Sequence, residues 1–511
     1  MNLFSRVLCG VAALALVGAA AADEFTDRLN VAYQSLADSR RAENIIMPVL
    51  GDMQEPPGIL LGRADRVLLL TPSSPAWTSA TNWSTAETQL AALEALATIT
   101  EEENPRRAMR FAIPYGINGV STAWVRKGIH AELGDPPTIA AVQMGYLKRM
   151  KWLESLVHIE ATRLASQGQY EQAMEMVFDL ALLGRMVADR QLAEEVQWGL
   201  GASRSAMMRL RDLAYVDSKE GSILTGEFIK DLIARIDMQR GMFRLDRLRL
   251  PVGDQVAAEQ MAKRVFGVAG TPDQSVFPTS MAELAATSRP LRLFSESGRW
   301  KDAAENHAGK RQTDSTISGI YSDWSIRWDA DTFDPAFRTP SAYDRLDASL
   351  YAMVKEIVPD LDELFVLRRE LEAELVGTRV ALAVRALTVE TGGMPSSLAF
   401  VRPRYIDDLG IDPYNPDRRA GNMPELQFFV PVRDTARNEL HTMNVVPANR
   451  TNFSVRLDDE QFVLYSLGGN EFDDRAVFVS DSGLNLAGDY LIWPPVLGLL
   501  REYLEDTGGS E

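Results

Sequence analysis

The stretch LDELFVLRRELEAELVGTRVALAVRALTV, residues 361–389, predicts the long helix that connects the two parts of this chain. Its apolar residues recur at spacings of three, four or seven, which is typical of one helix face. They are Leu364, Leu367, Leu371, Leu375, Leu382, Ala386 and Val389. We expect the helix to begin near Ser341 and to bend at Pro359, because the proline ring removes a backbone donor. The apolar seam must pack against another element.

The part of the chain before this helix is predicted to be helical. With 511 residues the chain is too long for one ordinary core, so two or three domains are expected. Helical periodicity dominates from Asp23 to about Arg240, and three helices are expected between Pro137 and Tyr215. We therefore predict an all-helical N-terminal domain over residues 23–266.

One turn inside this domain carries a recognisable pattern. In ASQGQYEQAMEM, residues 165–176, Gly168 is expected to end one helix, and Tyr170 and Ala173 to begin packing in the next. This spacing resembles the turn of a tetratricopeptide repeat. A solenoid of such repeats needs about three units, and one is visible, so the resemblance implies a single αα-hairpin.

Residues 267–340 are rich in polar and turn residues, and we expect an irregular connection there. The segment IYSDWSIRWDADTFD, residues 320–334, places aromatic residues beside carboxylates. The aromatic residues are Tyr321, Trp324 and Trp328, and the acids are Asp323, Asp329 and Asp331. Aromatic rings beside acids suit a sugar-binding surface, whereas tryptophans that anchor the segment by packing are the alternative. We favour packing, because large aromatic side chains commonly fill cores.

Residues 341–511 are predicted to form the long helix and a small C-terminal module. The strand-like runs are LQFFVPV (426–432), FSVRL (453–457), FVLYSL (462–467) and DYLIWPP (489–495). They predict a small antiparallel sheet. The expected fold is mainly α with a C-terminal α+β module, in which a long helix joins the sheet to the N-terminal helices.

An acidic loop follows the third of these runs. In GGNEFDD, residues 468–474, four side chains offer oxygen donors, and two later acids are placed to close a site around a cation. The donors are Asn470, Glu471, Asp473 and Asp474, and the later acids are Asp481 and Asp489. Ca²⁺ prefers six to eight such oxygens at a flexible site. The alternative is a solvated acidic turn without a metal.

The order of motifs in the last quarter of the chain resembles the soluble domain of the major pseudopilin of type II secretion. The matching pieces are Gly392–Leu398, Asp412–Pro416, Ser466–Asn470 and Gly488–Asp489. In that family the loop holds calcium, so the resemblance implies Asn470, Asp473 and Asp489 as metal ligands, beside Asp474. The chain departs from the family in the insert RAVFVSDSGLNLA (475–487), and it shows no fibre-forming N-terminal helix. We therefore expect no polymerisation into a pseudopilus.

The N-terminal segment MNLFSRVLCGVAALALVGAAAADEF predicts a signal peptide over residues 1–22. Arg6 precedes an apolar run that is too short to span a bilayer, and an Ala20-x-Ala22 site follows it. The protein is therefore expected to be periplasmic or secreted, without stable membrane insertion after cleavage. Because Cys9 is the one cysteine, the mature chain would contain no disulfide.

Charge and motif content restrict the function. A net charge of -18 repels phosphate backbones and anionic lipids, so nucleic acid is not an expected partner. The four histidines are scattered in sequence, and no H-E-x-x-H, G-x-S-x-G or phosphate-loop motif is present. Carboxylate pairs are the remaining catalytic candidates, namely Asp329 with Asp331 and Asp407 with Asp408.

Together these features predict a non-enzymatic scaffold or binding protein of the cell envelope. Its C-terminal module would contact an envelope protein partner, whose identity the sequence does not give, and would hold a structural calcium ion. The alternative function is a carbohydrate-binding protein or a glycoside hydrolase that uses the carboxylates near Trp324 and Trp328.

Overall fold

The computed structural model describes residues 24–62, 64–101, 107–288, 293–431, 440–447, 451–457, 461–482 and 488–508. The predicted signal peptide, residues 1–22, lies outside this range. Within it, the chain is mainly helical and ends in an α+β region, which confirms the predicted fold class. No described helix is both long and apolar enough to cross a membrane.

The first helices build the body of the molecule. They are α1 (Glu24–Gln34), α2 (Glu43–Asp52), α3 (Ala64–Leu69), α4 (Trp77–Ser84), α5 (Glu87–Thr100), α6 (Thr122–Arg126), α7 (Gly145–Ala165), α8 (Tyr170–Val187), α9 (Ala193–Glu220) and α10 (Gly226–Arg235). A two-stranded ribbon of β1 (Ala131–Glu132) and β2 (Gln143–Met144) precedes α7. The helices α7 and α8 form the αα-hairpin that the Gly168 turn predicted, and Gly168 has a positive φ of 74°.

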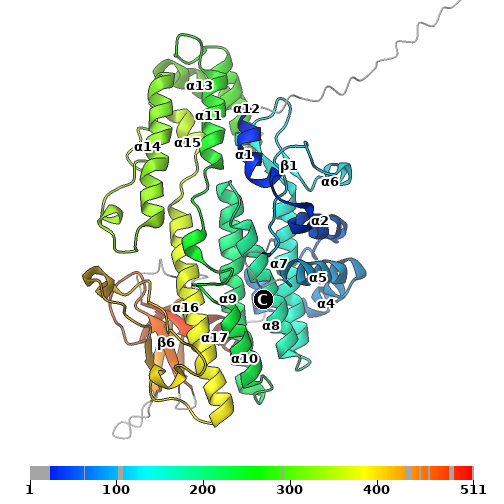
Figure 1. Cartoon of the computed structure of the whole chain (residues 1–511), viewed down its shortest axis with the longest axis vertical. Coiled ribbons are helices and arrows are strands. Elements are labelled where there is room, and N and C mark those ends of the chain that lie inside the picture. Colours follow the sequence, from blue (N-terminus) through cyan, green and yellow to red (C-terminus); the bar gives the residue numbers. More distant parts are fainter. Residues whose placement is uncertain are drawn as a thin grey trace, which may run out of the picture.

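The later helices extend the molecule at one end and link it to the sheet (Figure 1). They are α11 (Gly253–Val265), α12 (Val276–Ser288), α13 (Leu293–Asn306), α14 (Lys310–Asp329), α15 (Ala352–Ile357), α16 (Asp362–Thr391) and α17 (Val496–Asp506). The expected irregular connection over residues 267–340 is thus wrong, because α12, α13 and α14 lie within it. In α14 the buried residues Ile317, Trp324 and Trp328 recur at helical spacing among polar residues.

The long connecting helix is also shorter than predicted. No helix covers residues 341–351, and the helical run divides into α15 and α16. The gap between the two helices contains Pro359, which cannot donate the hydrogen bond that a continuous helix requires. The proline therefore separates two helices instead of bending one.

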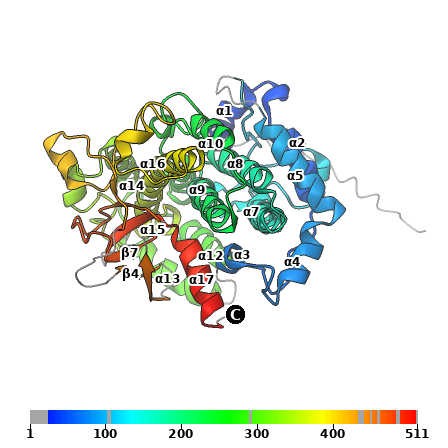
Figure 2. The same cartoon turned by 90° about the horizontal axis from the view of Figure 1, so that it is seen from below.

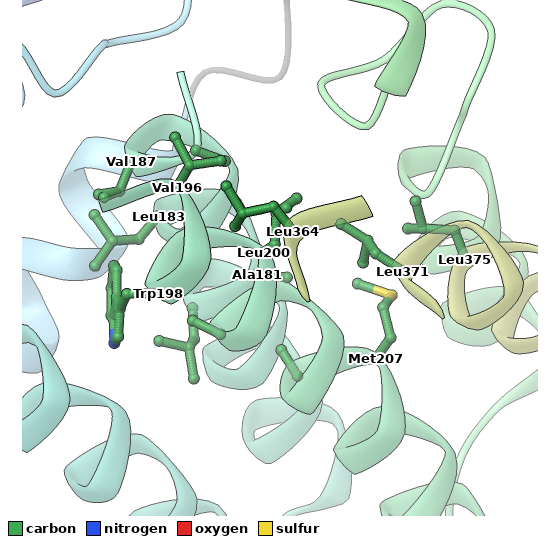
Figure 3. Close-up of a cluster of buried hydrophobic side chains, with 14 of the residues drawn as sticks. Ala181, Leu183, Val187, Val196, Trp198, Leu200, Met207, Leu364, Leu371 and Leu375 are labelled. Atoms are coloured by element: carbon green, nitrogen blue, oxygen red, sulfur yellow. The ribbon is translucent and has the colours of Figure 1, made fainter. Parts of the chain in front are cut away.

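The helices α8, α9 and α16 form the centre of the core. Figure 3 shows Leu364 and Leu371 of α16 beside Leu200 and Met207 of α9, so the predicted apolar seam packs against α9. The pair α8 and α9 packs more closely still. A Cβ atom on Gly199 of α9 would lie 2.5 Å from the backbone N of Ala188, so only glycine fits this crossing.

The C-terminal sheet has six strands in the order β3-β6-β8-β7-β4-β5. They are β3 (Gln427–Phe429), β4 (His441–Val445), β5 (Phe453–Leu457), β6 (Val463–Ser466), β7 (Phe478–Ser480) and β8 (Asp489–Trp493). Both neighbours of β7 run parallel to it, and the other pairs are antiparallel. The sheet is therefore mixed, which the sequence did not predict because β7 lies in the segment interpreted as an insert.

A buried ionic contact joins this sheet to the helices. Arg211 of α9 donates from Nε to the backbone oxygen of Ile492 in β8, at 3.0 Å. Its Nη1 donates to the hydroxyl of Thr378, at 2.7 Å, and to the carboxylate of Glu374, both in α16. Glu374 also accepts from the hydroxyl of Tyr490 in β8. Arg211 and Glu374 are both buried, so neither charge has water as an alternative partner.

Replacing Arg211 by alanine is expected to lower the free energy of unfolding by about 3–5 kcal/mol, because Glu374 would remain buried without its cation. Chemical denaturation of the wild type and the variant measures the difference. Arg311→Ala is the matched control, since Arg311 is an exposed arginine on α14. Equal losses in the two variants would show that the buried contact does not carry this stability.

Candidate functional site

An arginine-lined cleft of about 740 Å³ opens in the described structure. It lies between α1, the segment 108–112, the turn that joins α8 to α9, and the segment 241–252. Six arginines line it, against two acids: Arg110, Arg185, Arg190, Arg244, Arg247 and Arg249, with Asp189 and Asp246. We call it the arginine cleft. This excess of positive charge contrasts with the net charge of -18 of the chain.

The turn that carries Arg190 is held firmly in place. The backbone oxygen of Gln191 accepts a hydrogen bond of 2.7 Å from the backbone N of Gly253, the first residue of α11. A Cβ atom at position 253 would lie 2.6 Å from the same oxygen, which explains the glycine. This contact fixes the turn, and with it Arg190, against the start of α11.

Arg190 itself is buried and only partly satisfied. Its Nε donates to Glu195 at 2.7 Å, and its guanidinium carbon lies 4.3 Å from the ring centre of Tyr33 and 4.5 Å from that of Tyr115. Neither Nη1 nor Nη2 has a hydrogen-bond partner among the described residues. A buried hydrogen-bond donor without a partner lowers the stability of the fold, and the loss is larger when the donor belongs to a charged group. An oxyanion would accept hydrogen bonds from both nitrogens at once.

Glu195 has no capacity left for the remaining donors of Arg190. Besides the Nε of Arg190, its carboxylate accepts from the hydroxyls of Tyr115 and Tyr146 and from the backbone N of Leu192. Burial raises the pKa of the Tyr115 and Tyr146 hydroxyls well above the ordinary value, so both remain protonated donors. The negative charge of Glu195 is therefore fully engaged on the far side of Arg190.

The rim of the arginine cleft differs from its floor. Arg185 donates to Asp189 at 2.6 Å, and Arg244 is paired with Asp246, so these two cations are neutralised locally. The exposed Arg110, Arg247 and Arg249 form no salt bridge with the described residues. The cleft thus combines the buried guanidinium of Arg190, whose side chain is 0% exposed, with exposed cations at its mouth.

A second hollow of about 570 Å³ adjoins the first, since Arg244 and Asp246 line both. We call it the mixed-charge cleft. Its remaining charged residues are Arg327, Arg368, Arg369, Arg418, Asp329, Asp331 and Glu372. They come from α14, α16 and the 3₁₀ turn Pro416–Ala420 of the C-terminal region, so three parts of the chain meet here.

The aromatic segment 320–334 is explained by packing. Trp324 is 0% exposed and Trp328 is 2% exposed, and the indole N of Trp328 donates to the backbone oxygen of Leu248 at 2.8 Å. Neither indole face is available to stack on a sugar. The acids that follow, Asp329 and Asp331, do line the mixed-charge cleft, and Asp331 is paired there with Arg418.

The second carboxylate pair and the histidines lie elsewhere. Asp407 and Asp408 are exposed and outside both clefts, and Asp408 accepts from the backbone N of Gly410. His158 is buried in α7, and neither ring nitrogen has a hydrogen-bond partner among the described residues. Burial, with the nearby Arg209 cation, lowers the pKa of His158 to about 3, so the ring is neutral.

The predicted calcium ligands lie together, and their oxygens bind the loop itself. Asp489 accepts from the backbone N of Asp474 at 3.3 Å and of Ala476 at 2.8 Å. Asp473 accepts from the hydroxyl of Tyr465 at 2.9 Å, and the side-chain nitrogen of Asn470 donates to Asp474 at 3.2 Å. These hydrogen bonds connect the loop residues to one another. They engage part of the side-chain oxygens that were predicted to bind a cation.

One further acidic group could hold a metal ion. Carboxylate oxygens of Asp344, Asp360 and Asp362 lie within 4.8 Å of one another, and the three residues are exposed. No other trio of described acid, histidine or cysteine side chains is so close. The sequence analysis did not single these acids out. Their arrangement does not identify which ion, if any, they bind.

The arginine cleft was also missed from the sequence. Its arginines span residues 110–249, and no local pattern brings such distant positions together. The one local signal is GMFRLDRLRLPV, residues 241–252, a basic segment in an acidic chain. Comparisons with protein families, with characterised proteins and with solved structures find no significant match. The resemblance to the pseudopilin module stays a prediction.

The protonation of Asp489 should make stability depend on pH. Burial raises the pKa of its carboxyl to about 7, whereas in the unfolded chain it titrates near pH 3.9. The folded state therefore keeps the proton that the unfolded state loses, and stability falls as the pH rises from about 4 to 7. We expect the wild type to lose more thermal stability than Asp489→Asn between pH 5 and pH 8. Equal losses of thermal stability in the wild type and the variant would contradict this expectation.

Proposed function

We propose that this chain is a non-enzymatic exported binding protein of the cell envelope, and that it holds an anionic ligand in the arginine cleft. The observation that carries the proposal is the buried guanidinium of Arg190, with both Nη groups unpartnered among the described residues. The ligand would carry at least one carboxylate, phosphate or sulfate group, since these match the fork of an arginine.

The remainder of the arginine cleft supports the same ligand chemistry. The volume of about 740 Å³ falls in the range of small-molecule sites. The exposed Arg110, Arg247 and Arg249 would attract an anion towards the mouth, against the repulsion of the otherwise acidic surface. Periplasmic or secreted localisation and an envelope protein partner remain parts of the proposal that rest on the sequence.

Binding is tested by isothermal titration of the mature protein with citrate and with inorganic pyrophosphate, at constant ionic strength. We expect Arg190→Lys to weaken binding about tenfold or more, because lysine keeps a cation for Glu195 but lacks the two free donors. The loss of even one of these charge-assisted hydrogen bonds would cost about 1.5–3 kcal/mol, which corresponds to at least about tenfold in affinity. The double variant Arg247→Ala, Arg249→Ala should weaken binding and reduce its dependence on salt.

The controls separate folding from binding. Arg311→Ala removes an exposed arginine outside the arginine cleft and should bind both anions as the wild type does. The rim double variant changes only exposed side chains, so it stays informative even if Arg190→Lys unfolds. The proposal fails if neither anion binds, or if the rim variant binds both with unchanged affinity and salt dependence.

A structural calcium ion in the acidic loop is a second part of the proposal. When bound, the ion would draw on Asn470, Asp473, Asp474 and Asp489, and would supply positive charge among carboxylates that otherwise repel one another. A ligand at about one hundred times its Kd stabilises the folded state by about 2.7 kcal/mol. We therefore expect millimolar calcium to raise the thermal unfolding midpoint, more at pH 8 than at pH 6, because Asp489 must ionise.

Two double variants locate the ion. Asp473→Ala with Asp474→Ala should abolish the calcium shift if the loop is the site. Asp360→Ala with Asp362→Ala should leave it unchanged, since these acids belong to the exposed trio. The reverse pattern would move the ion to the trio, and no shift in the wild type would leave the loop as a solvated turn.

A further inference from the structure

The mixed-charge cleft contains charged side chains that form no hydrogen bond or salt bridge with the described residues. Four of its five arginines have partners: Arg244 pairs with Asp246, Arg327 with Asp323, Arg418 with Asp331, and Arg368 donates to two backbone oxygens. Arg369 has neither a hydrogen bond nor a salt bridge to the described residues, and its guanidinium lies 5.0 Å from the ring centre of Phe337.

Two carboxylates of the same cleft are also unpaired. Glu372 and Asp329 form no hydrogen bond or salt bridge with the described residues, although both line the cleft. Glu372 lies three positions after Arg369 on α16, so the two residues share one helix face, with about 5–6 Å between their Cβ atoms. Both residues are half-buried, and burial raises the pKa of Glu372 and lowers that of Arg369.

The unpaired set is one cation and two anions around a partly apolar floor. Phe337 and Phe365 contribute to that floor, and Asp329 lies on the exposed side, at the end of α14. A carboxylate ligand alone would satisfy Arg369 and repel Glu372, whereas an amine alone would do the reverse. A molecule that carries both groups satisfies both, and a second amine would reach Asp329.

We propose that the mixed-charge cleft binds a basic amino acid, with its α-carboxylate on Arg369, its α-ammonium on Glu372 and its side-chain ammonium at Asp329. The aliphatic part of the ligand side chain would lie along Phe337 and Phe365. This site is independent of the anion proposed for the arginine cleft, because none of Arg369, Glu372 and Asp329 lines that cleft.

L-Lysine is the probe, and three molecules that lack one or two of its charged groups are its controls. Norleucine lacks the side-chain ammonium, acetate has only a carboxylate, and methylammonium has only an amine. Isothermal titration of the wild type should show L-lysine binding more tightly than norleucine by about tenfold, the effect of one charge-assisted contact. Acetate and methylammonium should show no detectable binding at the concentrations that saturate with L-lysine.

Variants assign each contact. Arg369→Gln and Glu372→Gln should each remove L-lysine binding, while Asp329→Asn should reduce it to the level of norleucine and leave norleucine unchanged. Arg311→Ala is the control with an exposed arginine outside the cleft. Asp329 is exposed, so Asp329→Asn still tests the binding site if the α16 variants unfold. The proposal is overturned if L-lysine does not bind, if acetate binds as tightly, or if Glu372→Gln binds L-lysine normally.

Discussion

The fold depends on the buried contact between Arg211 and Glu374. Both charges have left water, and their pairing offsets that cost only when the surrounding donors and acceptors are also in place. Those groups belong to α9, α16 and β8, so the three elements must assemble together. Apolar packing continues through the same region, from Leu29 of α1 to Leu500 of α17 in one cluster. The sheet is therefore a structural part of the helical body.

The position of both clefts follows from this assembly. With one face of α16 held against α9, residues on another face, such as Arg369 and Glu372, line the mixed-charge cleft beside α14. The segment 241–252 crosses the surface between the two clefts and contributes to each. An acidic protein thus places ten of its arginines along two adjoining hollows.

Sequence periodicity predicted what depends on local repetition. The seam that contains Leu371 packs as expected, and the Gly168 turn joins α7 to α8 as an αα-hairpin. It failed where apolar residues are sparse: α14 buries Ile317 and Trp324 within a polar sequence, and β7 is only three residues long. Polar composition was wrongly interpreted as irregular structure at α14, and β7 was missed because its segment was interpreted as an insert.

The sites required information that no local pattern holds. Arg110, Arg190 and Arg249 belong to separate segments, and only the folded chain brings them to one cleft. The unpaired state of Arg369 is likewise a property of its three-dimensional neighbours. By contrast, the acidic loop was visible in the sequence. Its contacts show that Asp489 accepts hydrogen bonds from the backbone of the loop.

The last helix has a consequence for the order of folding. Figure 2 shows α17 beside α3 and α9, where Arg501 binds the buried Asp212 at 2.8 Å and the backbone oxygen of Leu68, 433 positions earlier in the chain. A chain under synthesis lacks this partner until residue 501 has been made, and contacts between such distant segments form slowly. The early helices therefore reach their final packing only after α17 has been made.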